Sequence, residues 1–96
     1  AILEELELGN NKIGVSGAIA IADALVVNRT LLLLGLRSNP IGDEGMCAIT
    51  TALRQNVTLR RLNISNIDIS TTAGAGAIAD ALRSNTSLKG LYLSQN

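Results

Sequence analysis

The sequence predicts an α/β solenoid, an open arc in which short parallel strands line one face and helices line the other. Three observations lead to this prediction: a motif that recurs every 28 or 29 residues, alternating apolar residues at the start of each unit, and an alanine-rich segment with helical spacing after it. The chain has 96 residues, enough for a single domain, and 47% of them are hydrophobic. Such an apolar content excludes a disordered chain, which lacks the surface to offset its ordering entropy.

The repeat is visible when the chain is divided at Leu3, Leu31, Leu59 and Leu88. Each unit has leucine or isoleucine at its first, fourth and sixth positions, as in Leu3, Leu6 and Leu8. We therefore divide the chain into repeats 3–30, 31–58 and 59–87 and a partial repeat 88–96, which form one array over residues 1–96. Because every repeat begins with the same pattern, the same structural unit is expected in each.

Each repeat combines two periodicities. The alternation of Leu6 and Leu8 is typical of a strand with one buried face, whereas Met46, Ile49 and Leu53 follow helical spacing. We expect four parallel strands about 4.8 Å apart and helices over residues 15–26, 43–54 and 73–83. Asparagines follow these helices, at positions 28, 56 and 85, where they are expected to adopt the left-handed conformation of a C-terminal cap.

The pattern Leu-x-x-Leu-x-Leu-x-x-Asn-x-Ile-Gly, followed by a helix that ends in Ala-Leu, resembles the ribonuclease-inhibitor class of leucine-rich repeat. Its asparagine form is similar to the repeats of NOD-like receptors, RanGAP-type proteins and tropomodulin. The resemblance implies a right-handed horseshoe with strands on the concave face and helices on the convex face. It also implies a cytoplasmic protein-interaction or scaffolding module; the alternative is the regulatory array of a larger protein such as a GTPase activator or a NOD-like receptor.

A second expectation concerns the asparagines that follow the strands. Asn11, Asn39 and Asn96 share one repeat position and are expected to turn inward, where their amides bond to the backbone of adjacent turns. We call this column the turn ladder. The third repeat has Ile67 at that position and Asn66 one residue earlier. Either Asn66 substitutes after a local shift or the ladder is interrupted there, and the unshifted positions of Leu62 and Ile64 favour an interruption.

Composition and motifs give no sign of an enzyme. The chain has no histidine and its net charge is zero, which argues against metal chemistry and against nucleic-acid binding. Residues 74–79 fit G-x-G-x-x-A, but the strand and acidic residue that a dinucleotide site requires are missing around them. We therefore expect no catalytic, cofactor or metal site, no membrane segment, and a protein as the partner.

Other polar features have structural explanations. Cys47 lies on an expected helix without a histidine to activate it, and its being the single cysteine fits a reducing compartment. Four N-x-[ST] sequons begin at residues 28, 56, 63 and 85. Three of them, at 28, 56 and 85, recur at one repeat position, so helix caps explain them better than glycans. Glu4, Glu5 and Glu7 are interpreted as a solvated acidic edge rather than a metal cluster.

The concave face is the candidate binding surface. If Leu6 and Leu8 are buried, the residues that alternate with them face solvent, as do their counterparts in later repeats. The partner-binding candidates on this face are Glu5, Glu7, Leu33, Arg37, Arg61, Asn63 and Tyr92. The face is thus acidic in the first repeat, apolar at Leu33, and basic with one aromatic residue in the later repeats. We also expect flanking repeats or self-association, because repeat arrays need polar caps and neither terminal unit has one.

Overall fold

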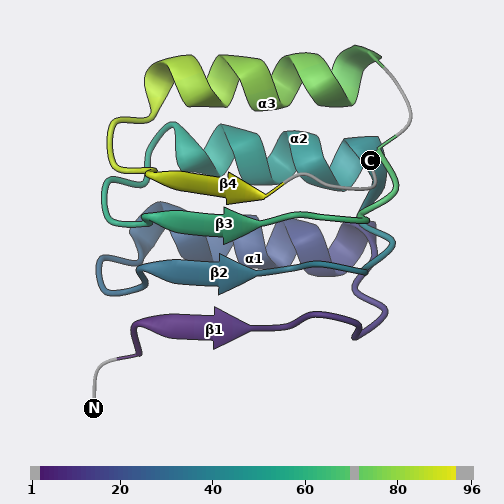
Figure 1. Cartoon of the computed structure of the whole chain (residues 1–96), viewed down its shortest axis with the longest axis horizontal. Helices are drawn as coiled ribbons and strands as arrows, with labels where there is room; N and C mark the ends of the chain where they lie inside the picture. The colour runs from purple at the N-terminus through teal and green to yellow at the C-terminus, as the bar shows by residue number, and fades with distance from the viewer. Residues whose placement is uncertain (1–2, 70–71, 93–96) are drawn as a thin grey trace.

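The computed structural model describes residues 3–69 and 72–92 and contains three strand–helix units followed by a fourth strand (Figure 1). In chain order, the elements are β1 (Glu5–Glu7), α1 (Val15–Val27), β2 (Leu33–Gly35), α2 (Gly42–Leu53), β3 (Arg61–Asn63), α3 (Thr72–Ser84) and β4 (Gly90–Tyr92). The strands form a parallel sheet in the order β1-β2-β3-β4. The predicted α/β solenoid with four parallel strands is confirmed, and each helix boundary lies within one residue of its predicted position.

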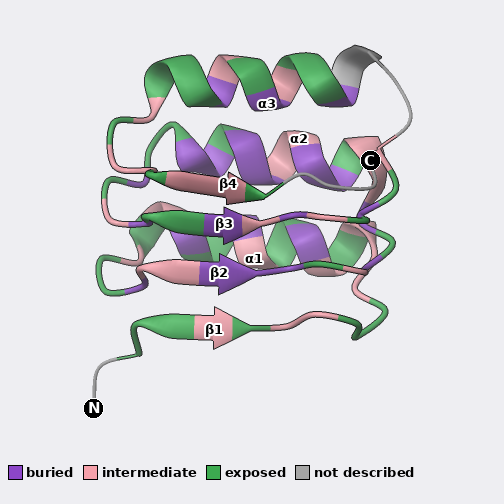
Figure 2. Ribbon diagram, viewed as in Figure 1, coloured by how far each residue is buried: buried purple, intermediate pink, exposed green. Residues whose placement is uncertain are grey.

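The chain forms two layers, with the sheet on one side and the helices on the other (Figure 1). Each helix packs on the next, α1 against α2 and α2 against α3. Every unit therefore contacts only its neighbours, so the hydrophobic core is a continuous slab between the layers rather than a closed centre. Figure 2 shows the buried residues of this slab in β2, β3 and the helices, whereas β1 and β4 contain no buried residue.

The repeated leucine and isoleucine positions fill this core. The large apolar side chains that are fully buried come from the second and third repeats: Leu34, Leu36, Ile41, Met46, Ile49, Leu59, Leu62, Ile64 and Ile67. Except for Ala18, the counterpart of Met46, the equivalent residues of the first repeat are less buried, because no further repeat covers them among the described residues. The contrast is clearest in one column, in which Leu3 is 57% exposed and Leu31 only 6%.

The small residues of the helices allow close packing between neighbouring helices. A Cβ atom added to Gly45 in α2 would lie 3.0 Å from the Cβ of Ala18 in α1 and 2.6 Å from Cγ2 of Ile41. No larger side chain fits between α1 and α2 at this point without moving the helices apart. The alanine- and glycine-rich composition of these segments therefore sets the spacing of the outer layer.

Asn28 and Asn85 directly follow α1 and α3, whereas α2 ends at Leu53 with Arg54 as its cap, and the asparagines do not have the predicted conformation. Asn28, the C-terminal cap of α1, has φ −75° and ψ 136°, which is extended backbone. Asn56 and Asn85 do not have a positive φ either. The prediction of left-handed caps is therefore wrong: the Oδ1 atoms of all three asparagines bond to amides of the following turn, and Asn56 and Asn85 also bond to the end of the preceding helix, as described below.

Candidate protein-interaction surface

The strands place the predicted binding residues in two columns across the sheet. Residues Glu5, Leu33, Arg61 and Gly90 are aligned in one column, and Glu7, Gly35, Asn63 and Tyr92 in the next. Glu5, Glu7, Arg61 and Tyr92 are exposed, whereas Leu33 and Asn63 are half-buried. The structure thus brings these candidates together on one face, in the order acidic, apolar, basic along the first column.

Several of the larger side chains lie across the glycines of the neighbouring strand. A Cβ atom on Gly35 would be 2.5 Å from Oε1 of Glu7, so the Glu7 carboxylate lies over β2 rather than over its own strand. The Arg37 side chain extends toward the first repeat, because a Cβ atom on Gly9 would be 3.1 Å from Cγ of Arg37. The glycines therefore form shallow seats that hold charged side chains flat against the sheet.

At the basic end of the concave face, side chains likewise lie over a glycine. A Cβ on Gly90 would lie 3.6 Å from Cγ of Arg61 and 3.8 Å from the hydroxyl of Tyr92, so both side chains reach over this glycine. Tyr92 nevertheless keeps 52% of its surface exposed. The half-buried Asn63 has a local role, since its Oδ1 accepts a hydrogen bond from the Ser65 amide at 3.1 Å. Arg61 and Tyr92 are thus the residues at this end that present surface to a ligand.

The charged side chains of the concave face form no ion pair with other residues in the ranges 3–69 and 72–92. Among the described residues, the ion pairs involve Asp80 with Arg54 and Arg83 on the helical side, and none involves a strand residue. Glu5 and Arg61 are two strands apart in the register, about twice the 4.8 Å strand spacing, which is too far for a direct contact. Both charges therefore remain available to a partner.

The turn ladder is built around Asn39, which is 2% exposed. Its Oδ1 accepts hydrogen bonds from the amides of Asn11 and Ile13 at 2.8 and 3.0 Å. Its Nδ2 donates to the carbonyls of Leu8 and Leu36, both at 2.9 Å, and more weakly to that of Arg37 at 3.3 Å. One side chain thereby joins the turns of the first and second repeats, both of which follow strands of the concave face.

The other predicted members of the turn ladder differ. Asn11 does not turn inward: it is exposed, and its Nδ2 donates to the Gly9 carbonyl two residues away. The reason is that such an asparagine bonds to the turn of the preceding repeat, and no preceding turn exists among the described residues. Asn96 lies outside the described residues. In the third repeat Ile67 is fully buried and Asn66 is exposed, so the ladder is interrupted there.

The Asn39 contacts lead to a stability prediction. Replacing Asn39 by alanine should lower the free energy of unfolding by about 1–3 kcal/mol, because it leaves backbone groups of two turns without partners. Urea denaturation followed by circular dichroism measures the change. Asn11→Ala is the matched control and should change stability by less than about 0.5 kcal/mol. Equal effects of the two substitutions would contradict the turn ladder.

A second column of asparagines was not predicted as a ladder, although the repeat columns contain it. Nδ2 of Asn56 donates to the carbonyls of Leu25 and Asn28 in the preceding repeat, at 3.0 and 3.2 Å. Asn85 repeats this arrangement one repeat later, with the carbonyls of Leu53 and Asn56 at 2.7 and 3.0 Å. We call this column, Asn28, Asn56 and Asn85, the helix-end ladder, because it satisfies carbonyls at the ends of α1 and α2.

The helix-end ladder also explains the three sequons that recur at one repeat position. Oδ1 of each asparagine accepts hydrogen bonds from the amides two and three residues later, which turns the chain from the helix into the next strand. Asn56 is 2% exposed and both of its amide hydrogens are directed at carbonyls. Its amide is therefore inaccessible to a glycosylating enzyme in the folded chain.

Other classes of site find no support in the described part of the chain. Cys47 is half-buried on α2, and the described residues contain no group of three or more metal-ligating side chains. Likewise, none of the helices in the ranges that the structure covers is long and apolar enough to cross a membrane.

Comparisons with known proteins agree with this geometry. The family model described as "Leucine Rich repeat" matches residues 2–22 and 27–49. No curated protein was found to match the sequence. Among solved structures, the chain is similar to "Leiomodin-1 Actin-Binding Site 2 (ABS2)", with 36% sequence identity and a TM-score of 0.88 over 94% of this chain. The chain covers 53% of that structure, about half its length. The recurring motif, the parallel sheet with its layer of helices and these two likenesses together show that this chain contains leucine-rich repeats and has the fold of a leucine-rich-repeat solenoid.

Proposed function

We propose that this chain is a protein-interaction module that binds actin, or a protein with an actin-like surface, through the concave face of its arc. The observation that carries the proposal is the similarity to an actin-binding site of Leiomodin-1 at 36% sequence identity. The unpaired charges and the exposed Tyr92 on the concave face are consistent with it, since aromatic and arginine side chains dominate the energetics of many interfaces. As in other leucine-rich-repeat interaction modules, binding rather than catalysis is the expected activity, and a cytoplasmic setting remains a prediction.

The concave face suggests how a partner would be oriented. A complementary surface would place an apolar side chain on Leu33, cationic groups over Glu5 and Glu7, and an acidic group over Arg61. Charge complementarity of this kind mainly sets the orientation and the association rate, whereas a desolvated apolar contact holds the complex together. The Glu7 carboxylate, which lies over Gly35, brings the acidic region next to the middle of the sheet.

Binding of purified monomeric actin, measured by biolayer interferometry, tests the proposal. Leu33→Asp is expected to raise the dissociation rate by about tenfold, because it places a charge in the apolar contact. Arg61→Glu is expected to slow association by roughly threefold, and this effect should fade as the ionic strength rises.

The controls for this experiment lie on the helical side. Arg54→Glu and Arg83→Glu change the net charge by the same amount as Arg61→Glu, at residues paired with Asp80. Both should leave the actin kinetics unchanged within about twofold. If only these two variants weaken binding, the concave face is not the binding surface; if the unmodified chain does not bind actin, the proposed partner is wrong.

We also propose that the first repeat is covered by a further repeat or by a second copy of the chain. The support comes from equivalent positions in the first two repeats. Gly45, Ile49, Ala52 and Asn56, in and after α2, are buried, whereas their counterparts Gly17, Ile21, Ala24 and Asn28, in and after α1, are not. Leu3, Leu6, Ile21 and Leu25 line an apolar hollow of about 230 Å³ at this end. A repeat of the same design would fill it and accept hydrogen bonds from the Nδ2 groups of Asn11 and Asn28.

A further inference from the structure

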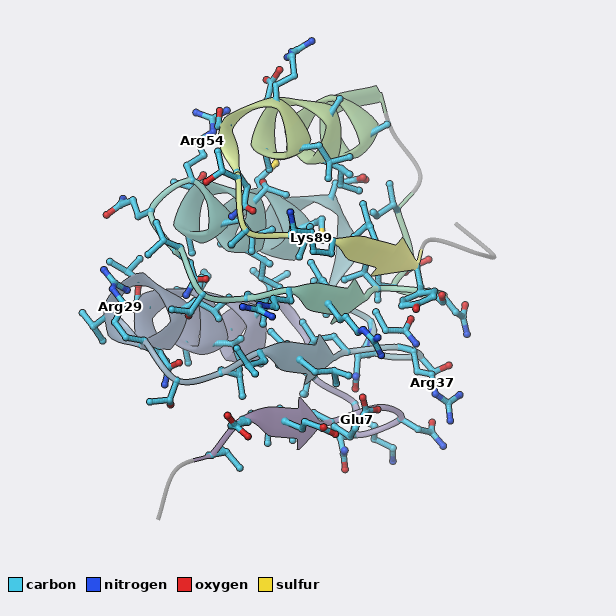
Figure 3. All side chains as sticks on the ribbon, turned by 60° about the vertical axis from the view of Figure 1, so that its left-hand side comes forward. Glu7, Arg29, Arg37, Arg54 and Lys89 are labelled. Atoms are coloured by element: carbon cyan, nitrogen blue, oxygen red, sulfur yellow. The ribbon has the colours of Figure 1, made fainter. Side chains whose placement is uncertain are left out.

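A groove lies outside the concave face, at the edge of the sheet where the chain passes from each helix into the next strand. It has a volume of about 480 Å³ and is lined by Leu32, Val57, Thr58, Arg60, Thr86, Ser87 and Lys89. These residues come from the loops before β2, β3 and β4. Figure 3 brings this edge forward, with Arg29, Arg54 and Lys89 labelled on it.

Two cations in this groove have no carboxylate partner. Arg60 and Lys89 occupy equivalent positions in adjacent repeats, and the Lys89 amide donates to the Arg60 carbonyl at 2.7 Å. Among the described residues neither forms an ion pair, whereas Arg54 pairs with Asp80 and Arg29 donates to the carbonyls of Val26 and Asn28. Neighbouring like charges without an internal counter-ion create a positive potential that favours an anionic ligand.

The position before each strand carries a graded series of side chains. Glu4, Leu32, Arg60 and Lys89 occupy this position in the four repeats, so the edge changes from acidic to apolar to basic. The adjacent column on the concave face, Glu5, Leu33, Arg61 and Gly90, has the same order. The charge gradient therefore extends around the edge of the sheet and does not end at the concave face.

The groove also offers apolar groups. Val57 is 62% exposed at its side, and Leu32 is half-buried within it. The Thr58 hydroxyl is buried without a hydrogen-bond partner among the described residues, whereas the equivalent Ser87 hydroxyl donates to the Leu59 carbonyl at 2.9 Å. The Thr58 oxygen is too buried to reach a ligand, so the polar recognition in this groove rests on Arg60 and Lys89.

These features favour a peptide over a nucleic acid. The groove contains no aromatic side chain on which a base could stack, since the sole aromatic residue of the chain, Tyr92, is on the concave face. The exposed Val57 suits an aliphatic side chain of a ligand rather than a phosphate backbone. We propose that the groove binds an extended acidic peptide segment of a partner protein, with carboxylates at Arg60 and Lys89 and an aliphatic residue against Val57 and Leu32.

A fluorescein-labelled, glutamate-rich peptide with one central leucine is the probe, and fluorescence anisotropy with the whole chain measures its affinity. The double variant Arg60→Glu/Lys89→Glu is expected to bind the peptide roughly tenfold more weakly. Both side chains are exposed, so the thermal unfolding curve should be retained. The double variant Lys12→Glu/Arg83→Glu, which changes the net charge equally at exposed residues outside the groove, should bind as the original chain does.

Leu33→Asp separates this site from the concave face and should leave peptide affinity unchanged. The groove assignment is overturned if Leu33→Asp or the Lys12→Glu/Arg83→Glu control weakens peptide binding as much as Arg60→Glu/Lys89→Glu does. Tighter binding of a single-stranded oligonucleotide of equal charge would also overturn it in favour of nucleic acid. Because the probe contains no actin, failure of the actin proposal would leave this result unaffected.

Discussion

Replacing Leu34 by alanine is expected to lower the free energy of unfolding by about 3–5 kcal/mol, as for other fully buried leucines. Leu34 is the middle residue of β2, it is 0% exposed, and its register partners Leu6 and Leu62 flank it on both sides. The substitution removes apolar contacts and leaves a cavity between two repeats. These repeats are held in place by the rest of the array and cannot move inward to fill it. Urea denaturation followed by circular dichroism gives the change in free energy.

Leu6→Ala is the matched control, because Leu6 occupies the same column in the first repeat and is only half-buried. Its loss should cost about half as much, since the partly open end of the array can relax and admits water. Equal costs at the two positions would mean that the end of the array is as tightly packed as its middle, contrary to the exposure of the first repeat.

The sequence predicted the fold well because the repeat carries redundant information. The columns of Leu6, Leu34 and Leu62 and the helical spacing of Met46, Ile49 and Leu53 each indicate an element, and their common period fixes how the elements stack. Parallel pairing and register follow from this period alone, without any long-range contact having to be guessed. The same reasoning located the interruption at Ile67, where Leu62 and Ile64 remain in register.

The conformations of individual side chains could not be predicted from the repeat pattern. Alternation places Glu7 on the concave face, but only the neighbouring strand shows that its carboxylate lies over Gly35. Asparagine after a helix has two options: a left-handed backbone cap, or a side chain that bonds to neighbouring carbonyls. All three asparagines use the second option through local Oδ1 bonds to the amides two and three residues later. The added bonds of Asn56 and Asn85 reach carbonyls of the preceding repeat, which local sequence does not reveal.

The edge groove was missed for a related reason. The sequence was interpreted through strand alternation, which assigns residues to the core or to the concave face. Arg60 and Lys89 precede their strands and belong to neither set. Their signal was nevertheless present, because cations occupy equivalent positions in two adjacent repeats. Comparing the columns that flank each strand, as well as those within it, would have drawn attention to this edge.

The helix-end ladder makes the second large prediction: Asn56→Ala should lower the free energy of unfolding by about 2–4 kcal/mol. The side chain is 2% exposed and makes four hydrogen bonds to backbone, of which those with Leu25 and Leu59 are fully buried. By contrast, four of the five Asn39 bonds are only partly buried, so water replaces them more readily. The effect at Asn56 should therefore exceed that at Asn39.

Two variants show whether the Asn56 effect arises from the bonds between repeats. Asn28→Ala removes an equivalent side chain whose Oδ1 bonds are local, and which lacks a preceding helix among the described residues; it should cost about 1 kcal/mol. Asn56→Asp keeps the shape and the Oδ1 bonds but directs an oxygen at the Leu25 carbonyl, so it should be at least as damaging as alanine. If Asn56→Asp is tolerated, or if Asn28→Ala costs as much as Asn56→Ala in urea denaturation, the ladder does not join the repeats and local turn formation alone explains these asparagines.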